Sequence, residues 1–283
     1  MKIRKPHVAN AFYEGSKKAL QEQIVNCFTH KLGPGRVPDP AVGPKGILGV
    51  VVPHAGYMYS GPVAAHSYAQ IASDGVPDSV VILGPNHTGI GSGVSIMTKG
   101  GWETPLGVTP IDTDLAEQIR TSSNIIDEDE TAHLSEHSIE VQLPFLQYLY
   151  GERIRFVPIC MMMQDLQTSQ EIARAISERS RGKHVVVVAS SDFTHYEPQD
   201  VAARKDRAAI DAIVDLDSPK LNGLGEGGRV TMCGYGPITV LMEVAKLKGN
   251  VHASLLAHHT SGDITDDPGS VVGYSAISFT RDE

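Results

Sequence analysis

Three histidines and one cysteine stand where an α/β protein would carry out its chemistry. His54, His87 and His195 each follow a short run rich in valine, isoleucine or leucine, and Cys233 precedes the apolar segment 235–248. Such runs, separated by helical stretches, are typical of buried parallel strands. Ligands of open α/β sheets bind beyond the carboxyl ends of the strands. The spacing therefore predicts that these side chains share one site at that edge of a sheet.

His54 and His87 are predicted to bind a metal ion together. Pro53 and Pro85 precede them at the ends of their apolar runs. Proline interrupts strand pairing, so the chain leaves the sheet at both places and both imidazoles enter the crevice. Two imidazole nitrogens placed in this way can share a metal ion. The alternative is that each ring only hydrogen-bonds to carbonyl groups of its own loop.

Cys233 is the predicted third ligand. Pro237 suits the first turn of the helix expected at 235–248, which places the thiol near a helix amino terminus. That position is expected to lower the thiol pKa and favour the thiolate. A buried, inert cysteine is the alternative, and it is the role predicted for Cys27 and Cys160. Two imidazoles and a thiolate suit iron, copper or zinc and disfavour magnesium and calcium.

A second group of polar residues is predicted to move protons. His195 and Asp192, in SSDFTHY, are interpreted as a general acid or base and its orienting carboxylate, or as residues that hydrogen-bond a bound substrate. Helix capping is a further alternative for Asp192. Ser190 or Ser191 could instead be a hydrolase nucleophile, but the chain lacks a GxSxG elbow. His137, in the polar head of an apolar helix, is predicted to face the same site.

Strands and helices alternate along the chain to position these residues. Strands are predicted at 46–52, 78–84, 154–159, 184–190, 251–258 and 270–279, with a hairpin in 92–110. Helices are predicted at 16–31, 61–73, 112–122, 138–150, 167–180, 198–215 and 235–248. Pro144 must kink its helix or mark its first turn. The alternation predicts a three-layer α/β fold, with a mostly parallel or mixed central sheet covered by helices on both faces.

Composition favours a single α/β domain over residues 1–283. The Gly/Pro-rich segment 33–46 is predicted to be a surface loop, because the 32 residues before it cannot bury a core alone. A net charge of -9 without a Lys/Arg cluster disfavours nucleic-acid binding. No apolar run approaches the roughly 20 residues of a membrane helix. Three widely spaced cysteines and no apolar leader segment predict a cytoplasmic protein.

Eight strings, in order, make the chain resemble the Memo family over nearly its whole length. They are RKPHVANAFYEG, VVPHAGYMYSG, ILGPNHTG, WETPLG, EHSIEVQLPFLQ, SSDFTHY, MCGYGP and TSGDITDDPGSVVGYSA. Asn10 and Glu14 replace the glycine and proline expected in the first string, at an end predicted to be structural. The family is similar in fold to class III extradiol dioxygenases, which cleave catechol-like rings at a non-haem iron.

The resemblance implies a metal-binding protein with a dioxygenase-like pocket. It implies the ligands His54, His87 and Cys233, with Asp192 lining the pocket and His195 matching the dioxygenase acid/base histidine. Those dioxygenases have a carboxylate where this chain has Cys233, so ring cleavage is not carried over. The implied activity is iron- or copper-dependent redox chemistry on a small substrate. The alternatives are a peptide- or phosphopeptide-binding module and a zinc-dependent hydrolase. The implied partners are an AMMECR-family protein and a radical S-adenosylmethionine enzyme.

Overall fold

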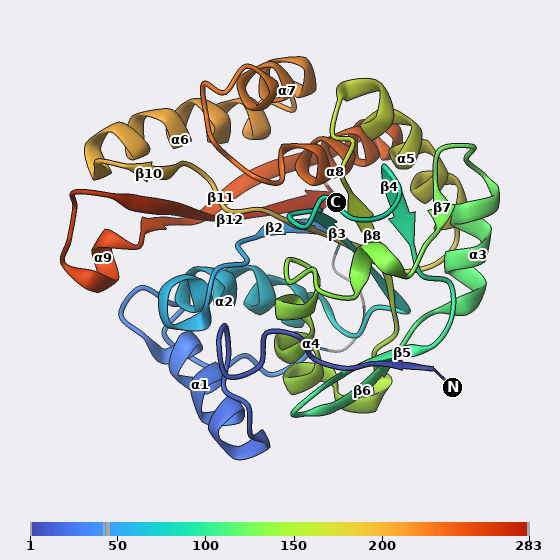
Figure 1. The fold of residues 1–283 in the computed structure, drawn as a ribbon, viewed down its shortest axis with the longest axis horizontal. Helices are drawn as coiled ribbons and strands as arrows, with labels where there is room; N and C mark the ends of the chain where they lie inside the picture. Colours follow the sequence, from blue (N-terminus) through green and yellow to red (C-terminus); the bar gives the residue numbers. More distant parts are fainter. Residues whose placement is uncertain (1, 42, 44–45, 282–283) are drawn as a thin grey trace.

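The strands of the described chain form a nine-stranded sheet and a smaller three-stranded one (Figure 1). The computed structural model describes residues 2–41, 43 and 46–281. In spatial order the larger sheet contains β10 (His195–Glu197), β12 (Val271–Arg281), β2 (Ile47–Val52), β9 (Val185–Ser190), β3 (Ser79–Pro85), β8 (Phe156–Met161), β4 (Val94–Ile96) and β7 (Asp127–Glu128), and β11 (Val251–Thr260) pairs with β12. The smaller sheet contains β1 (Ile3–Arg4), β5 (Gly101–Thr104) and β6 (Gly107–Pro110).

Four adjacent strands, β2, β9, β3 and β8, are parallel to one another. Every residue of these strands is buried, because helices cover the sheet on both faces and the strands are rich in valine, isoleucine and leucine. Their carboxyl ends therefore meet at one edge. β12 pairs antiparallel with β2, β10 and β11, so the complete sheet is mixed.

Helices lie on both sides of the larger sheet, as the sequence predicts. They are α1 (Lys17–Thr29), α2 (Tyr57–Asp74), α3 (Thr113–Thr121), α4 (Leu143–Tyr150), α5 (Leu166–Arg179), α6 (Gln199–Val214), α7 (Ser218–Glu226), α8 (Tyr235–Lys248) and the short α9 (Gly262–Thr265), with 3₁₀ turns η1 (Thr131–His133), η2 (Glu140–Gln142) and η3 (Gly151–Arg153). In Figure 1, α1, α2 and α4 lie below the sheet and α5 to α8 lie above it. The predicted α/β fold with a mixed central sheet is confirmed.

Two predicted helices have different bounds in the structure. The helix expected at 61–73 begins at Tyr57, just past the site loop, and accommodates Pro62 within its second turn. The helix expected at 138–150 is α-helical only from Leu143, because Pro144 occupies its first turn and cannot donate a backbone hydrogen bond. The 3₁₀ turn η2 replaces its predicted beginning. The sequence interpretation also missed α7, whose glycines and proline concealed it.

A buried ion pair attaches the N-terminal segment to η2. The Arg4 guanidinium lies 2.6 Å from a carboxylate oxygen of Glu140, and both side chains are almost fully buried. The same carboxylate accepts hydrogen bonds from the backbone N–H groups of His7 and Val8 and from the Tyr13 hydroxyl. These residues of the first of the eight strings are therefore structural, as predicted.

The remaining sequence predictions concern the core and the loops. Cys27 and Cys160 are buried, and burial raises the pKa of the Cys27 thiol to about 12. The predicted loop contains no helix or strand in its described residues, 33–41, 43 and 46. Its residues 42, 44 and 45 lie outside the described residues. The same is true of residues 1, 282 and 283 of the predicted domain. Within the described chain, every helix is too short or too polar to cross a bilayer.

Candidate metal centre

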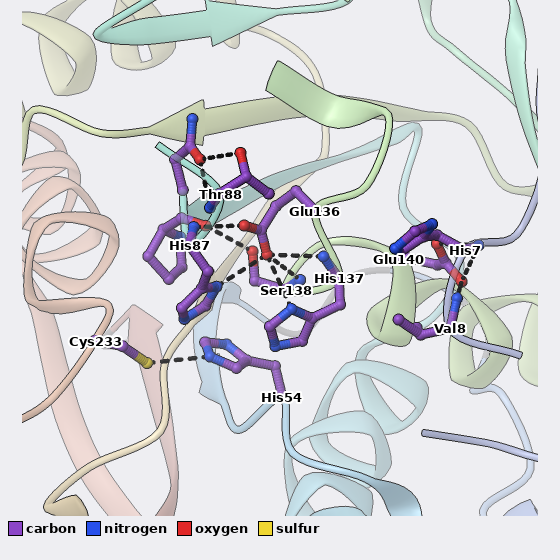
Figure 2. A network of polar contacts seen from close by, with 12 residues as sticks. His7, Val8, His54, His87, Thr88, Glu136, His137, Ser138, Glu140 and Cys233 are labelled. Atoms are coloured by element: carbon purple, nitrogen blue, oxygen red, sulfur yellow. Dashed lines mark hydrogen bonds and ion pairs between the residues drawn. The ribbon is translucent and has the colours of Figure 1, made fainter. Parts of the chain in front are cut away.

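Neighbouring strand ends bring the predicted ligands together. His54, His87 and Asp192 each stand two residues beyond the last residue of β2, β3 and β9, which are adjacent in the sheet. Cys233 lies just before α8, and its Sγ is 3.1 Å from His54 Nε2 (Figure 2). One ligand atom each from His54, His87 and Cys233 lies within 4.8 Å of the other two. The structure therefore places the three predicted metal ligands around one point.

The His54 ring is held in one tautomer by Ser190. The Ser190 hydroxyl has a single hydrogen, which it donates to the carbonyl oxygen of Ser138 at 2.7 Å. Its oxygen accepts from Gln142 Nε2 at 2.9 Å and lies 2.8 Å from His54 Nδ1. Ser190 can therefore only accept at Nδ1, so the ring proton is on Nδ1. Nε2 is left with a free lone pair directed toward Cys233.

Glu136 holds the His87 ring in the same way. The Glu136 carboxylate, which is completely buried, lies 3.0 Å from His87 Nδ1 and accepts hydrogen bonds from the backbone N–H groups of His87, His137 and Ser138 (Figure 2). Burial alone would raise its pKa, but the hydrogen bond and charge of His87, the charge of His137 and the Ser138 amide lower that pKa to about 2. An ionised carboxylate can only accept, so Nδ1 carries the His87 proton and Nε2 is available as a ligand.

The donor set fits a transition metal. Two imidazole lone pairs and one sulfur match the ligand types of iron, copper and zinc sites. Glu136 also forms a close group with His87 and His137, but its oxygens already accept hydrogen bonds from these two residues and from Ser138. We therefore assign Glu136 to the orientation of His87 rather than to metal binding.

The thiol of Cys233 differs from the sequence expectation. Burial and the nearby charge of Asp192 raise its pKa above the ordinary value, whereas a helix amino terminus was expected to lower it. The reason is geometric. Gly234 is the N-cap of α8, so Cys233 precedes the helix, and its thiol lies near the Asp192 charge, which disfavours the thiolate. A metal ion bound here must therefore displace the thiol proton.

Asp192 connects two of the ligands. Its Oδ1 accepts from the backbone N–H of His54 at 2.8 Å, and its carbonyl oxygen accepts from the backbone N–H of Cys233 at 3.3 Å. Burial raises the pKa of the carboxyl group to about 6, against the lowering effect of the His54 amide. The alternative role as a helix cap is wrong, because the next helix, α6, has Pro198 as its N-cap.

His195 is oriented by a backbone carbonyl and not by Asp192 as predicted. Its Nδ1 lies 2.7 Å from the carbonyl oxygen of Thr231, which can only accept, so the ring proton is on Nδ1 and the lone pair is on Nε2. The serine-nucleophile hypothesis also fails. Ser190 and Ser191 are fully buried, and their hydroxyl hydrogens are donated to backbone carbonyl oxygens.

His137 lies inside the cluster. Its ring stacks on His87 with centroids 4.6 Å apart and meets His54 edge-on at 5.4 Å. Burial lowers its pKa to about 4, against the effect of the adjacent Glu136 charge, so the imidazole is neutral at neutral pH. A cavity of about 680 Å³ is lined by His137 together with His54, His87, Asp192 and His195. The predicted ligands and proton-transfer residues therefore face one cleft, apart from Cys233, which contacts His54.

The family model described as "Memo-like protein" matches residues 4–278 of this chain. This chain belongs to the Memo family. A MEMO1 family protein of Methanopyrus kandleri is 50% identical over 280 residues, covering 98% of this chain and 99% of that protein. Another from Methanothermobacter thermautotrophicus is 50% identical over 279 residues, covering 98% and 100%. The resemblance inferred from the eight strings is confirmed.

A solved structure shares the fold at much lower sequence identity. The crystal structure of an uncharacterized protein from Escherichia coli K12 is 12% identical, with a TM-score of 0.51, and the match covers 82% of this chain and 99% of that one. At this identity the likeness is one of fold only.

In this Memo family member, the sequence interpretation missed the residues that fix the rings. Glu136, Ser190 and Thr231 accept the ring protons of His87, His54 and His195. Two of them left a weak signal in the sequence. Glu136 stands next to His137 in EHSIE, and Ser190 is a polar residue at the end of a buried valine run. Thr231 left none, because it belongs to a loop whose position depends on tertiary structure.

Proposed function

We propose that this Memo family member is a metal-dependent redox enzyme that holds iron or copper on His54, His87 and Cys233. The observation that supports it most is the 3.1 Å between His54 Nε2 and Cys233 Sγ. Each histidine directs its Nδ1 proton to a fixed acceptor and its Nε2 lone pair remains free, as in known histidine metal sites. Two imidazoles and a thiolate are a ligand set for iron and copper, and both of these metals change oxidation state.

The neighbouring residues have distinct roles in this proposal. When bound, the metal supplies one-electron chemistry and polarises a substrate group. His195 accepts a substrate proton at Nε2, while the Thr231 carbonyl holds its Nδ1 proton. Asp192 keeps the His54 and Cys233 loops together through its two hydrogen bonds. His137 presents a neutral ring to the cleft and excludes water from the face of His87.

The experiment that tests the proposal begins with protein purified anaerobically without chelators. We expect about one iron or copper per chain by mass spectrometry. We also expect that metal to be reduced by ascorbate and reoxidised in air, as followed by electron paramagnetic resonance. Zinc at the same level would favour the hydrolase alternative. A metal that stays in one oxidation state under both treatments would contradict the redox proposal.

A further inference from the structure

The outer part of the cleft presents aromatic rings to solvent. Tyr59, in the first turn of α2, and Tyr196, in β10, both line the cavity of about 680 Å³, and Tyr196 is 78% exposed. Phe12 lines it as well. Exposed aromatic residues gathered around a cavity offer flat apolar surface and π-electron density to a ligand.

Tyr196 is held in a strained backbone conformation at this position. Its φ is +58°, in the left-handed region that residues with a side chain rarely adopt. Its neighbours His195 and Glu197 pair with Val272 and Val271 of β12, and the register shifts between them. Such strain persists where surrounding contacts impose it, and it is concentrated at functional sites. Here one irregularity places both the His195 ring and the Tyr196 ring on the cleft.

The charges around the cleft are negative. Asp267 lines it, and one of its carboxylate oxygens accepts from the Gly269 N–H at 2.9 Å. Among the described residues that line the cleft there is no lysine and no arginine. At this outer part of the cleft a phosphate or carboxylate would therefore meet the like charge of Asp267 and aromatic faces, and an anion would gain only from the metal ion of the proposed function. An ammonium group would be attracted both by Asp267 and by the tyrosine rings.

We propose that the cleft takes an aromatic ligand that carries an ammonium group, with its ring against Tyr59 and Tyr196 and its ammonium group near Asp267. This inference rests on the proposed function, because it names the class of substrate for the same site. It also argues against the phosphopeptide alternative, since phosphate recognition uses arginine or lysine side chains and this cleft offers neither.

A matched series of small molecules tests the inference. Tyramine, tyrosol and 4-hydroxyphenylacetate have the same phenol ring and similar length, but carry charges of opposite sign or none. Their dissociation constants would be measured by ligand-observed NMR titration, with the protein as purified and again after chelation. We expect tyramine to bind about threefold to fivefold more tightly than tyrosol, as expected for one exposed ion pair and one cation–π contact. We expect 4-hydroxyphenylacetate to bind most weakly after chelation.

Variants assign the preference to named residues. Asp267→Asn should reduce the preference for tyramine over tyrosol to the part that the cation–π contact supplies, while Asp266→Asn, at an exposed neighbour that does not line the cleft, should leave the preference unchanged. Tyr196→Ala should weaken all three. Equal binding of the series, or tightest binding of 4-hydroxyphenylacetate after chelation, would overturn the inference. If the ligand inference failed while the protein held stoichiometric redox-active metal, the proposed function would still stand. If tyramine bound preferentially but the protein held no metal, the ligand inference would stand and the proposed function would fail.

Discussion

His54 Nε2 and Cys233 Sγ lie 3.1 Å apart although the two residues are 179 positions apart in the chain. His54 follows β2 and Cys233 precedes α8, and Asp192 after β9 accepts a backbone hydrogen bond from each of them. The fold therefore builds this pair from three separate segments, and Asp192 is the residue that joins them.

Asp192→Ala should loosen the site, whereas Asp192→Asn should largely preserve it. The alanine variant leaves the buried His54 N–H without its acceptor, at a cost of about 1–3 kcal/mol, and asparagine still offers a carbonyl oxygen. We expect metal affinity, measured by competition with a chromogenic chelator, to fall about tenfold or more in Asp192→Ala. Equal losses in both variants would show that the charge of Asp192 matters and not its acceptor oxygen.

Glu136→Gln should weaken metal binding without removing a ligand. The amide cannot accept from the His87 ring and from three backbone N–H groups as the carboxylate does. Loss of such an orienting carboxylate typically lowers metal affinity by about 10-fold to 100-fold. Glu130→Gln, at a partly exposed residue paired with Lys2, is the matched control and should bind metal normally. Unchanged affinity in Glu136→Gln would refute the assigned role.

Glu140→Ala should destabilise the protein strongly while the metal ligands remain present. It leaves Arg4 buried without its partner and removes the acceptor of the His7 and Val8 amides. Breaking a buried pair in this way costs about 3–5 kcal/mol. Lys2→Ala removes an exposed pair and should cost at most about 1 kcal/mol. Urea unfolding of both variants measures the difference, and similar costs would contradict this account.

The placement of the site could be predicted from the sequence, but the partners of its rings could not. Valine-rich runs before His54, His87 and Asp192 indicate parallel strands whose ends must meet. The acceptors of the ring protons come from distant segments, such as Ser190, 136 positions from His54. Which side chain reaches which ring depends on tertiary packing. Burial raises the pKa of Cys233, where the sequence predicted a lowered pKa. No local sequence pattern indicates that a cysteine in a loop is buried.

His184 should make stability depend on pH at the opposite end of the sheet from the metal centre. Its Nε2 lies 3.0 Å from the buried carboxylate of Asp74, whose hydrogen bond and charge raise the His184 pKa against the effect of burial. A histidine whose pKa is higher in the folded state than in the unfolded state stabilises the protein when it is protonated. This stabilisation is fully present below the unfolded-state pKa of about 6.5, and it disappears as the pH rises through the folded-state pKa. His184→Asn should therefore destabilise more at about pH 5.5 than at about pH 8.5, by up to about 1 kcal/mol. Urea unfolding at both pH values measures this, and an equal or larger loss at high pH would contradict it.

In the proposed function, His54, His87 and Cys233 together hold one metal ion. X-ray absorption spectroscopy of the iron- or copper-loaded protein tests it most directly, with Cys233→Ser beside it and Cys27→Ser as the control at a buried thiol outside the site. We predict one sulfur at about 2.3 Å and two imidazole nitrogens at about 2.0–2.1 Å, by analogy with the distances of zinc sites. The sulfur signal should disappear only in Cys233→Ser. A metal shell without sulfur in the unaltered protein, or the same shell in Cys233→Ser, would contradict the claim.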